Sequence, residues 1–151
     1  VGRMLTGEYD EAANEVEVIR TEMDDDVVLK VIIESGALKT PELIRKASLL
    51  SMLAGADFVK TSTGKIDVAA TPEAAVVMCQ AIRDYYDKTG RKVGFKAAGG
   101  ISTSKDAVCY HSIVKSILGN EWMNKDLFRF GVSRLANSLM SSIEQKTVVY
   151  F

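Results

Sequence analysis

Three lysines lie in or at the ends of apolar segments, and they are the residues of this chain best suited to chemistry. Lys30, Lys60 and Lys96 each fall in a run rich in β-branched or aromatic residues. Lysine is among the least buried residue types, so one such position is readily explained as a snorkelling side chain on a frayed edge strand. Three in series instead favour side chains that converge on one pocket at neighbouring strand ends.

Convergent lysines have a specific use, which is the formation of a Schiff base with a carbonyl compound. Only the neutral amine attacks a carbonyl, yet a lysine of ordinary pKa is neutral in only about one part in a few thousand at pH 7. Desolvation and a neighbouring cation both lower the lysine pKa and so favour the neutral form. The resulting iminium accepts the electrons of an adjacent C–C bond as that bond breaks. The pattern therefore predicts lyase chemistry.

Glycine- and hydroxyl-rich segments follow three of the apolar runs and are suited to binding phosphate. They are Thr61–Lys65, Gly99–Ser102 and Gly131–Ser133. Glycines expose backbone N–H groups to an anion, and a following helix adds its positive N-terminal end. Each segment alone is equally well explained as a plain turn. Together they predict a phosphate site, with Lys65 as a point charge.

The elements that must position these residues alternate between short apolar strands and longer amphipathic helices. Four apolar runs begin about 29, 36 and 36 residues apart, the length of one βα unit. The predicted strands are 27–33, 56–60, 92–96 and 128–131. The predicted helices carry apolar stripes within 12–19, 43–53, 74–85, 107–117 and 135–143.

Capping residues support these helix boundaries. Thr40-Pro41-Glu42 and Thr71-Pro72-Glu73 each provide an N-cap hydroxyl, a proline at the first helical position and an acid in the first turn. Gly55, Gly90 and Gly119 stand where the helices are expected to end.

Strands that alternate with helices predict an α/β fold with a parallel sheet and right-handed crossovers. An open doubly wound sheet and part of a closed (βα)8 TIM barrel both satisfy this pattern. The dinucleotide-binding fingerprint of the open sheet is absent, and polar residues follow every strand. We therefore predict half a barrel, about the last four βα units, since 151 residues are too few for eight.

Composition excludes several classes of partner. Nineteen basic and twenty acidic residues give a net charge of −1, so neither nucleic acid nor a membrane is expected as a partner. Cys79 and Cys109 are predicted to be buried, unpaired thiols of a cytoplasmic protein. His111, the only histidine, is predicted to be a helix-surface or packing residue and not part of a zinc site or catalytic triad. Position 1 is not methionine, which led us to expect further chain upstream.

The segment Asp57–Gly64, of sequence DFVKTSTG, closely resembles the Schiff-base segment of the deoxyribose-phosphate aldolase family. The segments 29–34, 44–47, 94–101 and 128–131 add to the resemblance. It covers positions 1–143, which we interpret as the C-terminal half of a TIM-barrel aldolase domain, and leaves 144–151 as a tail. Ala97 and Arg134 depart from the family pattern, where proline and a second serine are common.

The resemblance implies reversible cleavage of 2-deoxy-D-ribose 5-phosphate to acetaldehyde and D-glyceraldehyde 3-phosphate, a step of deoxyribonucleotide catabolism, without metal or cofactor. It identifies Lys60 as the nucleophile, Lys96 as the lysine that lowers the pKa of the nucleophile and joins the proton relay, and Lys30 as a substrate-orienting lysine. The positions implied to bind substrate phosphate are Thr63, Gly64, Lys65, Gly99, Gly100, Gly131 and Ser133. Tyr150 is offered for the proton transfer that a C-terminal tyrosine assists in some members.

The relay aspartate of the family lies on the fourth barrel strand, and no residue of this sequence matches it. Asp57 begins its strand, away from the C-terminal end. Half a barrel also leaves two open strand edges. We therefore expect the chain to pair with an N-terminal half or to dimerise. Two alternatives remain open: a transaldolase-type Schiff-base enzyme with another sugar phosphate, and a non-catalytic half barrel that binds phosphate or self-assembles.

Overall fold

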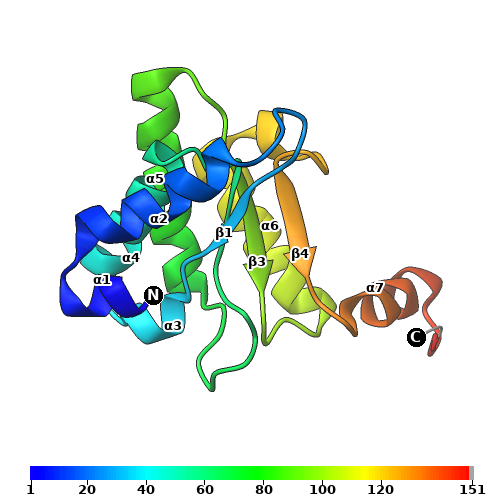
Figure 1. Ribbon diagram of the computed structural model, residues 1–151. Helices are drawn as coiled ribbons and strands as arrows, with labels where there is room; N and C mark the ends of the chain where they lie inside the picture. The colour runs from blue at the N-terminus through cyan, green and yellow to red at the C-terminus, as the bar shows by residue number, and fades with distance from the viewer. Residues whose placement is uncertain (150–151) are drawn as a thin grey trace.

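The computed structural model describes residues 1–149 and contains a four-stranded parallel sheet in the order β1-β2-β3-β4 (Figure 1). The strands are β1 (Lys30–Ile32), β2 (Phe58–Lys60), β3 (Gly94–Ala98) and β4 (Phe128–Gly131). Each strand pairs with the next one in the chain, which is the neighbour order of a (βα)8 barrel wall. The predicted α/β half-barrel architecture is thus confirmed.

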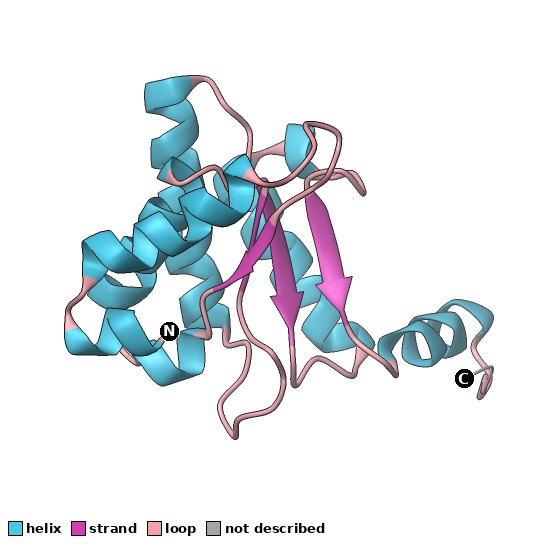
Figure 2. Ribbon diagram, in the orientation of Figure 1, coloured by secondary structure: helices cyan, strands magenta, loops and turns pink. Residues whose placement is uncertain are grey.

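The longer helices that follow the first three strands pack behind one face of the sheet, and the last helix lies to one side, beyond β4 (Figures 1 and 2). The front of β3 and β4 is free of helices (Figure 2). The helical segments are α1 (Gly2–Thr6), α2 (Tyr9–Thr21), α3 (Ser35–Leu38), α4 (Pro41–Leu53), α5 (Pro72–Thr89), α6 (Ser104–Leu118), the 3-10 turn η1 (Asn120–Trp122) and α7 (Leu135–Glu144). Among residues 1–149, no helix has both the length and the apolar character of a membrane span.

The core lies between the sheet and the helices α4, α5 and α6. Val59 and Phe95, which are paired in register, both have no exposed surface and point toward the helices. Met78, Ile82 and Trp122 complete the layer behind them, and the Trp122 indole donates to the Val93 carbonyl oxygen at 2.9 Å. Because side chains of a strand alternate between faces, the residues that flank Val59 and Phe95 must point to the opposite, helix-free face.

The predicted caps are present. The hydroxyls of Thr40 and Thr71 accept hydrogen bonds from Leu43 N at 3.3 Å and Ala74 N at 3.1 Å. Gly90 ends α5 with a φ of 71°, in the left-handed region that glycine adopts without strain.

Some local predictions were wrong. The first strand begins at Lys30 and not at 27, because Val27 and Val28 lie in the preceding loop, 45% and 52% exposed. The third strand runs two residues further than predicted, to Ala98. Cys79 is buried, and burial raises the pKa of its thiol, but Cys109 lies on the exposed side of α6 and is not a core thiol. The short helices α1 and α3 and the turn η1 have no periodicity long enough to predict them.

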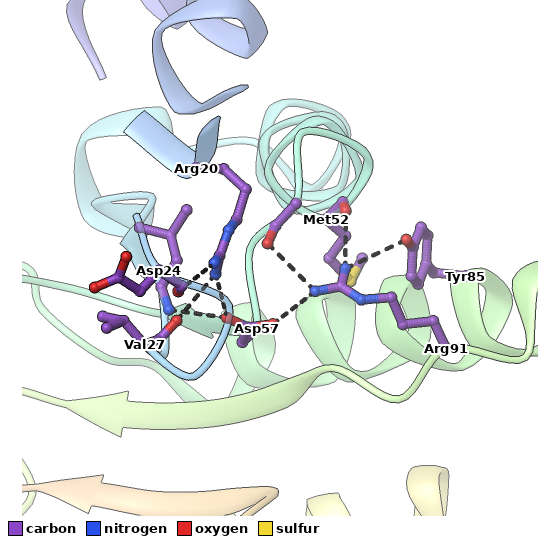
Figure 3. A network of polar contacts seen from close by, with 9 residues as sticks. Arg20, Asp24, Val27, Met52, Asp57, Tyr85 and Arg91 are labelled. Carbon is purple, nitrogen blue, oxygen red and sulfur yellow. Dashed lines mark hydrogen bonds and ion pairs between the residues drawn. The ribbon is translucent and has the colours of Figure 1, made fainter. Parts of the chain in front are cut away.

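A polar network joins the N-terminal end of the sheet to the helices, away from the loops that follow the strands (Figure 3). Asp57 accepts from Arg91 at 2.8 Å and from Arg20 at 3.3 Å, and it also accepts from Leu29 N at 2.9 Å. Arg91 donates to the carbonyl oxygens of Met52 and Gly55, at 3.3 Å each. One carboxylate thus connects α2, β1, β2 and the segment that leads into β3.

We expect the substitution Asp57→Ala to lower the free energy of unfolding by about 1–3 kcal/mol, because it leaves the Leu29 N–H without its acceptor and removes the carboxylate partner of two part-buried guanidinium groups. Urea denaturation followed by circular dichroism measures the change. The matched control is Asp84→Ala, which removes an exposed pair with Arg45 at 2.7 Å and is expected to cost less than about 1 kcal/mol. Equal losses for the two variants would contradict the role of the network.

Candidate active site

The strand register places the candidate lysines on one face of the sheet. Lys60 pairs with Ile32 on one side and with Lys96 on the other, and Lys96 pairs with Arg129. Lys30 precedes Ile32 by two residues and therefore lies on the same face. This face is the one opposite the helices, which corresponds to the interior of a barrel.

The site is a cluster of positive charge. Lys30, Lys60, Lys96 and Arg129 are all half-buried, and within residues 1–149 none of the three lysines forms an ion pair. Burial lowers the pKa of Lys96, and repulsion by the nearby ammonium groups of Lys30 and Lys60 lowers it further. The arrangement favours a neutral amine at this face and attracts an anionic ligand.

Arg129 contributes to the cluster and was not foreseen as a site residue. Its guanidinium lies over the Phe58 ring at 4.5 Å, and its charge also lowers the pKa of Lys96. The signal in the sequence was its position two residues before Gly131 in an alternating strand, which puts both residues on the interior face.

Gly131 lies against the Lys96 side chain. A Cβ at this position would lie 2.8 Å from Lys96 Cε and 2.8 Å from Ala98 Cβ. Because Gly131 has no side chain, the Lys96 side chain can occupy the space beside it. This role is separate from any contact that the Gly131 backbone makes with a ligand.

The loops predicted to bind phosphate lie side by side at the C-terminal edge of the sheet. A Cβ on Gly99 would lie 3.3 Å from Gly64 Cα, and Ala70 N donates to the Gly99 carbonyl oxygen at 3.3 Å. Gly64 and Gly99 have φ values of 77° and 86°, which favour glycine. Lys65, Gly100 and Ser133 are not buried and follow the same ends of the strands.

Thr61 and Thr63, which follow Lys60, use their hydroxyls within the protein. Thr61 Oγ1 donates to the Ala98 carbonyl oxygen and accepts from Ala98 N, both at 3.0 Å, which extends the pairing of β2 with β3. Thr63 donates its backbone N–H and its hydroxyl to the carboxylate of Glu34. Glu34 was not foreseen as a site residue, and the only sign of it was an acid directly after an apolar strand.

Other candidate positions lie away from this cluster or outside the described chain. Asp57 lies at the opposite end of the sheet in the network of Figure 3. Tyr150 lies outside the described residues. Within those residues, no group of three or more His, Cys, Asp or Glu side chains is arranged to hold a metal ion. A pocket of about 370 Å³ opens between α3 and the N-terminal ends of α4 and α5, and none of the three lysines lines it.

Comparison with known proteins identifies the family. The family model described as DeoC/LacD family aldolase matches residues 5–120. The chain belongs to this family. It is 48% identical over 143 residues to deoxyribose-phosphate aldolase of Mus musculus and 45% identical over 143 residues to that of Homo sapiens. Both alignments cover 95% of this chain but 43% of the relative, so the chain spans less than half the length of these curated relatives.

Solved structures agree with the fold. A putative deoxyribose-phosphate aldolase from Coccidioides immitis aligns with a TM-score of 0.69 and 31% identity over 87% of this chain and 45% of that one. A putative deoxyribose-phosphate aldolase from Toxoplasma gondii aligns with a TM-score of 0.79 over 93% of this chain and 53% of that one. The second match, at 22% identity, supports the fold alone.

The lowered pKa of Lys96 predicts how stability depends on pH. The folded state disfavours the charged form of Lys96, which costs stability at pH values where Lys96 is protonated in both states. As the pH rises from the lowered pKa toward the ordinary value of 10.5, the folded state binds fewer protons than the unfolded state, and this stability cost is lost. We expect Lys96→Met to unfold at higher urea concentration than the parent at pH 7, with a difference that shrinks toward pH 10. The exposed Lys125→Met is the control and should show no such trend. Parallel stability curves for the parent and Lys96→Met would rule out this electrostatic cost.

Proposed function

We propose that this chain carries the Schiff-base part of a class I deoxyribose-phosphate aldolase site, which reversibly cleaves 2-deoxy-D-ribose 5-phosphate to acetaldehyde and D-glyceraldehyde 3-phosphate. The observation that carries the proposal is the pairing of Lys60 with Lys96 on the helix-free face of the sheet. Family membership and the aldolase names of the relatives support the reaction class. The reaction belongs to deoxyribonucleotide catabolism, and the two free cysteines fit a reducing cytoplasm.

In the proposed reaction, the neutral amine of Lys60 attacks the substrate carbonyl. The resulting carbinolamine loses water to give an iminium. The C3 hydroxyl of the sugar then gives its proton to the relay that includes Lys96, and the electrons of the C2–C3 bond move into the iminium as that bond breaks. This leaves an enamine on Lys60 and releases D-glyceraldehyde 3-phosphate, whose new carbonyl is at the former C3. The enamine takes a proton at carbon, and hydrolysis of the iminium then releases acetaldehyde. Because two ammonium groups in adjacent register repel each other, loss of one proton from the Lys60–Lys96 pair is favoured.

Lys96 is well placed to move the protons in these steps, because its pKa is lowered and it neighbours Lys60. Lys30, on the same face, is proposed to orient the substrate hydroxyls. The adjacent glycine loops are proposed to bind the phosphate through backbone N–H groups, with Lys65 as a cation. The positive charge of the whole face favours a doubly charged phosphate ester over a neutral sugar.

The assembly is part of the proposal. Within residues 1–149, β1 and β4 each pair with a strand on one side only, which leaves two open edges. We propose that these edges pair with the N-terminal half of such an aldolase or with a second copy of the chain. Either partner would also cover the face that carries the lysines. Only an N-terminal half, which carries the relay aspartate in this family, would complete the proton relay.

Size-exclusion chromatography with light scattering tests the self-association. We expect a mass of at least twice the 16.5 kDa of the chain when it is prepared alone. A stable monomer across the micromolar range would contradict self-association and leave pairing with an N-terminal half as the remaining form of the proposal.

The Schiff base is tested by borohydride trapping with acetaldehyde, read by mass spectrometry of peptides. We expect an ethyl group on Lys60, no trapping at that peptide in Lys60→Met, and trapping about a hundredfold slower or worse in Lys96→Met, since a positioned proton-transfer group contributes about that much. The exposed Lys125→Met serves as the control and should behave as the parent. The absence of an adduct from both the chain alone and the chain with an N-terminal half would remove the proposal. Trapping with fructose phosphates but not with 2-deoxyribose 5-phosphate would instead favour a transaldolase-type substrate.

A further inference from the structure

Glu34 is a buried carboxylate directly after β1, and it contacts the loop that follows Lys60. Its side chain is 8% exposed and accepts three hydrogen bonds from Thr63: N to Oε1 at 3.1 Å, N to Oε2 at 3.3 Å, and Oγ1 to Oε2 at 2.5 Å. Its φ of 54° lies in the left-handed region, which is unfavourable for a residue with a side chain. Burial of the charge and the strained backbone both cost free energy, so the contacts with Thr63 must compensate.

The β2–α5 loop, residues 61–71, has little other support in its middle part. Residues 63–68 are all exposed. The pocket of about 370 Å³ is lined in part by Ser35 and Gly36 and by the loop residues Val68 and Ala69. Between residues 62 and 69, the hydrogen bonds that connect the loop to the rest of the described chain all end on Glu34.

The two residues after Glu34 contact the same loop at its two ends. Ser35 N donates to the Thr61 carbonyl oxygen at 2.8 Å. Gly36 lies against the other end, where an added Cβ would come within 1.8 Å of the Val68 carbonyl oxygen. The segment Glu34–Gly36 therefore contacts the loop at Thr61, Thr63 and Val68.

The contact with Glu34 engages two hydrogen-bond donors of the loop. Thr63 uses its N–H and hydroxyl hydrogens on the carboxylate, and its Oγ1 accepts from Lys65 N at 3.2 Å. Gly64, between these two residues, lies against Gly99. We propose that Glu34 is a positioning residue that shapes the β2–α5 loop so that Gly64 and Lys65 bind the substrate phosphate. This role rests on the proposed function.

Shape and charge predict opposite effects of Glu34. A carboxylate near a phosphate repels it, so its removal would tighten binding if charge alone mattered. If Glu34 instead holds the loop in shape, its removal weakens binding, because the ordering of the loop must then be achieved by the ligand. The direction of the change therefore tests the inference.

The experiment is a titration of the full chain with inorganic phosphate, followed by NMR or calorimetry. We expect Glu34→Ala to weaken phosphate binding about tenfold, which corresponds to the loss of a buried charged acceptor, and Glu34→Gln, which keeps one acceptor oxygen, to weaken it less. Gly36→Ala, which displaces the loop at its other end without a change of charge, should act in the same direction. The exposed Glu42→Gln, with the same change of charge, should bind as the parent. Hydrogen exchange of the 61–71 amides should accelerate in Glu34→Ala and Gly36→Ala only.

Unchanged or tighter phosphate binding by Glu34→Gln and Glu34→Ala would overturn the role of Glu34. Failure of the parent to bind phosphate, with the Lys60 adduct still trapped, would also overturn it but leave the Schiff base standing. Binding that weakens in the Glu34 variants while the parent traps no adduct would support the loop role and contradict the proposed reaction.

Discussion

The structure of the site depends on one constraint, the register that puts Lys60 next to Lys96. Neighbouring strands lie about 4.8 Å apart, so two lysines paired in parallel strands and directed to the same face must crowd each other. Within residues 1–149, no carboxylate forms an ion pair with either side chain. The protein accepts an electrostatic cost at this face. Burial lowers the pKa of Lys96, and the nearby charges of Lys30 and Lys60 lower it further.

The remainder of the sheet is arranged so that this cost does not disturb the fold. Val59 and Phe95, at the centre of the alternate row of side chains, have no exposed surface. At the N-terminal end of the sheet, Asp57 unites four segments through ion pairs and a backbone hydrogen bond. At the C-terminal end, the Thr61 hydroxyl bonds both backbone groups of Ala98 and holds β2 and β3 in register beyond Lys60. These stabilising contacts therefore lie at both ends of β2 and β3, the two strands that carry the lysine pair.

In the loops that follow the strands, glycines and one carboxylate have different structural roles. Glycines allow close approach, as at Gly64 against Gly99 and at Gly131 against Lys96, while a single acid, Glu34, connects the loop after β2 to the end of β1. Buried polar contacts of this kind restrict the conformations of a loop without requiring exposed apolar side chains. The site combines groups from four strands and their loops. Each group depends on contacts with neighbouring segments for its position, so the loops must be held in place.

What the sequence by itself determined is local. Strand and helix periodicity, the Thr-Pro-Glu caps and the lysine-centred segment led to the four βα units and to the family, since these signals lie within a few turns or strands of the chain. The start of β1 was missed because the apolar run begins before the residues that find a pairing partner, and the end of β3 was missed because pairing with β4 continues through Ala97 and Ala98. Only the tertiary structure decided that burial and neighbouring charges lower the pKa of Lys96, that Arg129 joins the cluster, and that Glu34 holds Thr63 across a separation of 29 residues. These facts depend on distances between segments far apart in the chain, which the order of residues does not contain.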